Sequence, residues 1–87
     1  MTSPKSSPHL RAAIIEVVDN QIRENDPPET KHTYERLLSE GHSEKEAKRL
    51  IGCVVASEIF EVLKHQKEFD KERFVKALDK LPKMPWE

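Results

Sequence analysis

The chain has 87 residues, with 15 Lys and Arg against 16 Asp and Glu and a formal net charge of -1, which predicts one small soluble domain. The balanced charges argue against a nucleic-acid surface, so no nucleic-acid partner is expected. The apolar stretches are too short for a membrane span, and the N-terminus lacks the apolar core of a signal peptide. We therefore expect no membrane association and a cytoplasmic location, which suits a single buried and reduced thiol at Cys53.

The first helix is expected to follow a short tail. Residues 1–6 are rich in serine and proline and predict disorder, whereas residues 7–87 predict a single helical domain. Ser7 fits the helix cap and Pro8 the first helical position. Apolar residues then recur at helical spacing, at Leu10, Ile14, Val17 or Val18, and Ile22.

The clearest break in the chain is the proline pair at positions 27 and 28, which ends the first helix. Asp26, Pro27 and Glu29 fit the cap, first and third positions of a second helix that should run to about Ser39. Gly41 supplies the left-handed residue that ends it. This helix and the next are expected to form a tight antiparallel hairpin.

The longest helix candidate, from Ser43 to Lys64, predicts the central helix because its apolar residues point nearly all the way round. Ser43 and Glu46 form a capping box at its start. The apolar face rotates along the helix, so its first half should pack on one neighbour and its second half on others. The two groups of apolar residues are Ala47, Leu50, Ile51 and Val54, followed by Val55, Ile59, Val62 and Leu63.

A fourth helix should begin after Asp70, which fits its cap, and Phe69 fits a hydrophobic staple onto Phe74. The apolar stripe ends at Leu81, and the tail from about residue 82 is not helical because it contains two prolines. The fold class predicted from these elements is all-α. We expect a compact single-domain bundle of four helices around the central helix at about residues 43–64.

Two small residues mark a predicted contact inside the central helix. Gly52 and Ala56 are one turn apart, and a glycine inside a helix costs about 1 kcal/mol relative to alanine. Such a cost needs compensation. The pair therefore predicts a helix crossing at which another backbone approaches closely.

Glu58 and Glu46 are the residues of a possible polar site. Glu58 continues the stripe of Ala47, Ile51 and Val54, which puts a carboxylate at the border of the core. Either an ion pair with a cation such as Arg36 or Lys48 holds it, or it is a desolvated carboxylate with a raised pKa. No metal ligands are predicted, because the histidines lack the spacing of a metal-binding helix. No catalytic residues and no cofactors are predicted either. The four histidines are His9, His32, His42 and His65.

The C-terminal tail carries two candidate partner-binding residues, Met84 and Trp86. In one interpretation the tail folds back and Trp86 covers the open end of the core, because a tryptophan buries a large apolar area. In the other, Trp86 is an exposed anchor for a partner, since tryptophan is enriched among binding hot spots. We expect the folded-back tail.

Four motifs give the chain a resemblance to a family of small bacterial all-helical proteins known only as a domain of unknown function. They are PHLRAAIIEVVDNQI, DPPET, ERLLSEGHSEKEAKRLIG and EIFEVLK, and they span about residues 8–81. Relatives in that family carry an HxxxH pattern and an HExxH-like pattern. The matching positions here are Arg11 and Ile15, then Lys45, Glu46 and Arg49, so the resemblance does not bring a metal site to this chain.

The function expected from these features is a small noncatalytic interaction or accessory domain, whose partner is an unknown protein or a second copy. Apolar and small residues account for the pattern without a convergent polar set. The alternative is a small metal-binding protein or enzyme that uses Glu58 and Glu46 with a histidine.

Overall fold

The structure is a computed structural model that describes residues 8–86, and within this range it contains four helices and no strand. The helices are α1 (Pro8–Glu24), α2 (Pro28–Ser39), α3 (Glu44–His65) and α4 (Lys71–Lys80). The predicted all-α bundle around a central helix is confirmed. The tail at residues 1–6 and the cap at Ser7 lie outside the described residues.

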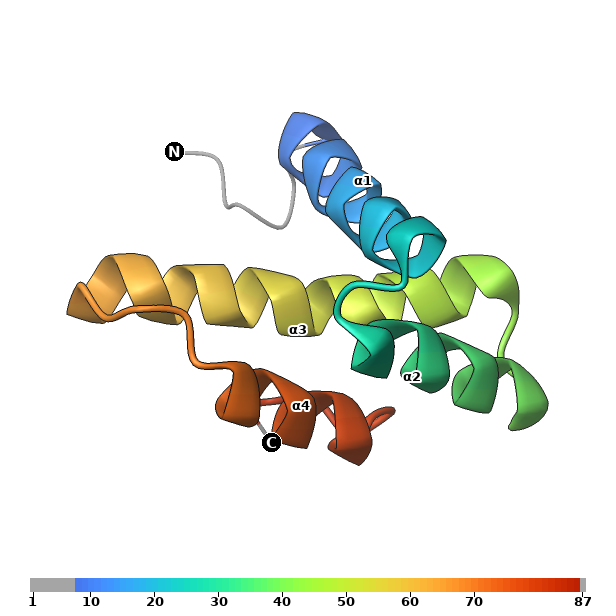
Figure 1. The fold of residues 1–87 in the computed structure, drawn as a ribbon. Coiled ribbons are helices and arrows are strands. Elements are labelled where there is room, and N and C mark those ends of the chain that lie inside the picture. The colour runs from blue at the N-terminus through green and yellow to red at the C-terminus, as the bar shows by residue number, and fades with distance from the viewer. Residues whose placement is uncertain (1–7, 87) are drawn as a thin grey trace.

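α3 is the longest helix and contacts each of the other three (Figure 1). In that view α1 lies above α3, while α2 and α4 lie below it, with α2 towards its N-terminal end. Among the described residues, α1 and α4 are the one pair of helices that do not pack on each other. None of the helices between residues 8 and 86 combines the length and apolarity that a membrane span requires.

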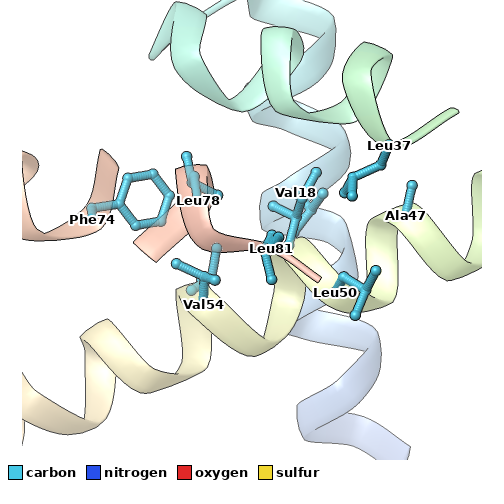
Figure 2. Packing of buried hydrophobic residues seen from close by; sticks show 10 residues of the cluster. Val18, Leu37, Ala47, Leu50, Val54, Phe74, Leu78 and Leu81 are labelled. Carbon is cyan, nitrogen blue, oxygen red and sulfur yellow. The ribbon is translucent and has the colours of Figure 1, made fainter. Parts of the chain in front are cut away.

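The core is assembled around the N-terminal half of α3. Val18 of α1, Leu37 of α2 and Leu78 of α4 belong to the same buried cluster, together with Leu81 just beyond α4 (Figure 2). All the α3 residues of this cluster lie between Ala47 and Val55. The complete cluster is Val18, Leu37, Ala47, Leu50, Ile51, Val54, Val55, Phe74, Leu78 and Leu81. The later turns of α3 therefore lie outside the main core.

Three helix ends are fixed by residues that the sequence predicts. The capping box at the start of α3 is only half formed, because the Glu46 carboxylate accepts from Arg49. The Ser43 side chain accepts a hydrogen bond from the Glu46 backbone N–H at the start of α3, and Asp70 accepts one from the Arg73 backbone N–H at the start of α4. Gly41 follows α2 with φ +100°, a left-handed conformation that costs glycine little. These three residues define the ends that bring α2 against α3 and α4 against α3.

The start of α2 differs from the prediction by one residue. Pro27 is the cap, with φ -75° and ψ 152°, and Pro28 is the first helical residue. A residue that precedes proline is forced away from helical dihedrals, so Pro27 cannot take the first helical position in front of Pro28. Asp26 therefore lies one residue before the cap.

Candidate functional site

An apolar groove of about 340 Å³ lies over the C-terminal half of α3. One wall comes from α1 and the opposite wall from Phe69 and Phe74, at the start of α4. Its lining is Val17, Gln21, Val55, Glu58, Ile59, Val62, Leu63, Phe69 and Phe74. We call this the apolar groove. It lies between the two helices that do not contact each other, α1 and α4.

Several lining side chains of the apolar groove are open to solvent. Leu63 is 73% exposed, Phe69 56% and Ile59 45%, and Phe60 beside them on α3 is 59% exposed. The expectation that neighbouring helices cover the second half of the central helix is therefore wrong for Ile59 and Leu63, whereas Val55 is buried and Val62 is half-buried. The reason is the length of α4, whose ten residues cover one side of α3.

Local interactions hold the walls of the groove in place. Thr30, a buried residue of α2, donates a hydrogen bond from its hydroxyl to Gln21 Oε1 at 2.8 Å. On the other wall, the ring centroids of Phe69 and Phe74 are 5.6 Å apart, as the staple predicts. Phe74 is buried, whereas the outer ring of Phe69 remains in solvent.

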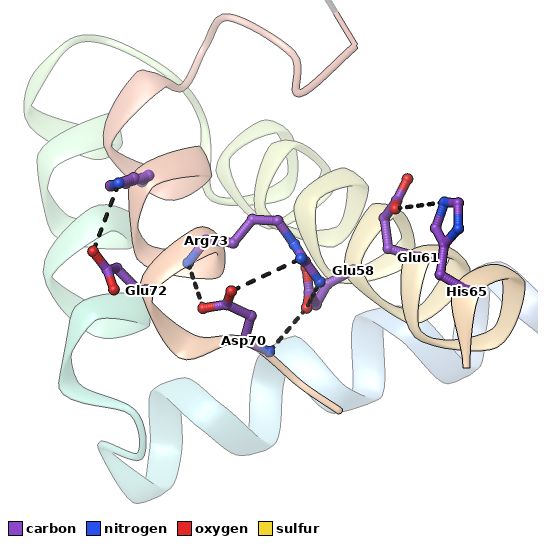
Figure 3. Close-up of polar contacts among 7 residues, drawn as sticks. Glu58, Glu61, His65, Asp70, Glu72 and Arg73 are labelled. Carbon is purple, nitrogen blue, oxygen red and sulfur yellow. Dashed lines mark hydrogen bonds and ion pairs between the residues drawn. The ribbon is translucent and has the colours of Figure 1, made fainter. Parts of the chain in front are cut away.

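Glu58 is the charged residue of the groove lining, and it forms an ion pair with Arg73 (Figure 3). Arg73 Nη2 donates to Glu58 Oε1 at 2.7 Å and Arg73 Nε to Oε2 at 2.9 Å. The Asp70 backbone N–H adds a bond to Oε1 at 3.2 Å. Glu58 is only 6% exposed, so this fork of donors replaces the water that the carboxylate loses.

The partner of Glu58 is not one of the cations expected from the sequence. Arg36 pairs with Glu40 at 3.0 Å, and Lys48 pairs with Asp19 of α1 at 2.8 Å. Hydrogen bonds from Arg73 lower the pKa of Glu58, and they outweigh the opposing effect of burial. The interpretation of Glu58 as a carboxylate with a raised pKa is therefore wrong. The geometry makes it an ionised residue that joins α3 to α4.

Glu46 lies in a different part of the molecule. It is twelve positions before Glu58 in α3, which corresponds to about 18 Å along a helix. Its carboxylate accepts hydrogen bonds from Arg49 at 2.6 and 3.1 Å, and these bonds lower the pKa of Glu46. The two carboxylates of the possible polar site are thus separate, and each is bonded to an arginine.

Gly52 is buried where α1 crosses α3. A Cβ atom at this position would lie 3.3 Å from Ile14 Cγ2 and 3.7 Å from Ile15 Cδ1. The nearest atoms are side-chain methyl groups, so the expected close approach of another backbone is replaced by two isoleucines that fill the space above the glycine. Ala56, one turn later, is half-buried.

The two tail residues have different surroundings. Met84 is half-buried and packs against the core, whereas Trp86 is 63% exposed. Trp86 is therefore not the lid that was expected over the core. Pro85 lines a second groove, between α3 and α4, together with Arg73 and Lys80.

Within residues 8–86, no three His, Cys, Asp or Glu side chains lie close enough together to hold a metal ion. Cys53 was expected to be buried, and it is half-buried.

No known family model, curated protein or solved structure matches the chain. The resemblance to a bacterial family of unknown function stays a prediction.

Sequence reasoning missed the apolar groove as a site. It identified Ile59, Leu63 and Phe69 as packing residues, and expected each of them to be covered within the bundle. One signal was available: the apolar residues of the central helix continue through Ile59 and Leu63, whereas the last helix has only ten residues.

Proposed function

We propose that this chain is a small noncatalytic protein-interaction domain of the cytoplasm, and that it binds its partner through the apolar groove. The observation that carries the proposal is the exposure of Ile59, Leu63 and Phe69 around one groove. The chain is otherwise polar, with 36% charged residues, so an apolar surface of this kind favours a partner over solvent. Grooves between helices commonly bind the apolar face of another helix.

The roles of the carboxylates support the same class of function. A metal-binding protein or enzyme built on Glu58 and Glu46 needs both near a histidine, yet the two are about 18 Å apart along α3. Each carboxylate is bonded to an arginine, Arg73 or Arg49. These bonds give Glu58 and Glu46 structural roles. The exposed side chains around the apolar groove therefore remain as the candidate binding surface.

Site-specific photocrosslinking in the cell tests the proposal. The photoreactive residue p-benzoylphenylalanine replaces Leu63 in one variant and Lys31, an exposed residue of α2, in a matched control. We expect protein adducts from position 63 and none from position 31. No adduct at position 63, or equal adducts at both positions, would contradict the proposal.

A further inference from the structure

We propose that the partner in the apolar groove is a second copy of this chain, related to the first by a twofold axis. This inference rests on the proposed function and names the occupant of the same groove. Homodimers with twofold symmetry need a surface that is complementary to itself. Three features of the described residues meet that requirement: the shape of the surface, the signs of the charges around it, and the apolar side chains at the end of α3.

The first feature is a ridge beside a groove on the same helix. The apolar groove has Ile59 and Leu63 in its lining, and Phe60 stands beside it, three residues before Leu63 on α3. The end of α3 is thus both part of the groove and an exposed apolar helix. In an antiparallel arrangement about these residues, the last turns of each α3 can enter the groove of the other copy, as amphipathic helices do.

The second feature is the charge around the groove. Glu24 lies three residues beyond Gln21 on α1, Lys64 follows Leu63 on α3, and Glu68 precedes Phe69. All three flanking side chains are exposed. A surface with charges of one sign would repel its own copy and select an oppositely charged partner, whereas this surface brings both signs to the contact. The formal net charge of -1 adds little repulsion between two whole chains.

The third feature is the number of apolar side chains that the end of α3 can offer to the groove of another copy. The lining has four exposed apolar residues, at Val17, Ile59, Leu63 and Phe69. Several apolar side chains are needed to cover them, and the end of a second α3 supplies Ile59, Phe60 and Leu63.

Sedimentation velocity of the full chain tests the second copy directly. We expect the weight-average sedimentation coefficient to rise from the monomer value towards the dimer value between about 10 µM and 1 mM, because a small interface gives a weak dimer. Leu63→Lys and Ile59→Lys should each raise the dimer dissociation constant at least about tenfold. Trp86→Lys, at a residue of similar exposure away from the groove lining, should leave it unchanged. Circular dichroism checks that each variant is folded.

Three results overturn the second-copy inference: a monomer at every concentration, lysine variants that dimerise like the parent, or a Trp86→Lys variant that loses the dimer. The photocrosslinking result separates this failure from that of the proposed function. Adducts from position 63 with the mass of two chains support the second copy. Adducts with a different protein alone keep the interaction function and refute the second copy, and no adduct refutes both.

Discussion

The two halves of α3 are similar in their content of apolar residues, but their surroundings in the fold are different. Both halves are rich in aliphatic residues. In the first half Leu50, Ile51 and Val54 are buried by three neighbouring helices, whereas Ile59 and Leu63 in the second half are largely exposed. The comparison shows that an apolar stripe records where a helix requires apolar contact. It does not record whether the same chain supplies that contact.

The largest expected difference is in stability. Ile51→Ala removes buried atoms from the core and should lower the free energy of unfolding by about 3 kcal/mol. Leu63→Ala, at an exposed position of the same helix, should change it by less than about 0.5 kcal/mol. Urea denaturation at low micromolar concentration, below the range in which we expect the dimer to form, measures both. Equal losses would mean that the second half of α3 is packed like the first.

The next effect concerns the ion pair that holds α4 on the second half of α3. Glu58→Gln should lower the free energy of unfolding at pH 7 by about 2 kcal/mol, because Arg73 is left without its carboxylate. Glu72→Gln is a matched control on α4, since the Glu72 side chain is 81% exposed beside Lys76, and should cost less than about 0.5 kcal/mol.

The cost of Glu58→Gln should also depend on pH. Because folding lowers the pKa of Glu58, its stabilising effect is complete above the unfolded pKa of about 4.3 and is lost as the pH falls through the folded pKa. The difference between the parent and Glu58→Gln should therefore be full at pH 7 and shrink as the pH falls below about 4. A difference that stays constant down to pH 3 would show that the Glu58 charge does not hold α4.

A smaller effect is expected at the crossing of α1, which separates the two halves. Gly52→Leu should destabilise the chain by about 1.5 kcal/mol, because Ile14 and Ile15 already occupy the space above the glycine. Gly52→Ala should be nearly neutral, since a gain of about 1 kcal/mol in helix propensity offsets a tight contact with a methyl group. Thermal denaturation that finds Gly52→Leu as stable as the parent would refute this packing.

The smallest effect is expected at the tail. Trp86 is largely exposed, so its fluorescence should be red-shifted, should be quenched by iodide and should change little on unfolding. Trp86→Ala should alter the free energy of unfolding by less than about 0.5 kcal/mol. A blue-shifted emission that resists iodide would restore the interpretation of Trp86 as a lid over the core.

The helices were predictable from the sequence because local signals define them. Ser43, Asp70 and Gly41 act within a few residues of their own position, and all three end or begin a helix as predicted. The error at Pro27 also has a local cause, since the effect of Pro28 on the preceding residue outweighs the capping preference of Asp26. Rules of short range therefore account for most of the fold.

The candidate site was less predictable because it depends on contacts across the chain. The position of Glu58 on the stripe of α3 places it at the core, but its partner Arg73 is fifteen residues away and across a loop. The hydrogen bonds from Arg73 lower the pKa of Glu58, so the direction of this shift could not be predicted without knowing the partner. The groove exists because α1 and α4 do not contact each other in the described residues. The periodicity of apolar residues in one helix does not predict which other helices it will contact.

Intermolecular paramagnetic relaxation most directly tests whether the second half of α3 is a contact between copies. A nitroxide is attached to the cysteine of a Glu68→Cys variant in a Cys53→Ser background. This spin-labelled chain, which contains no ¹⁵N, is mixed at high concentration with the ¹⁵N-labelled parent chain. We predict selective broadening of the amide signals of residues 59–63 and of Phe69 in the labelled copy, with α2 unaffected. No broadening, or broadening centred on α2, would contradict the account.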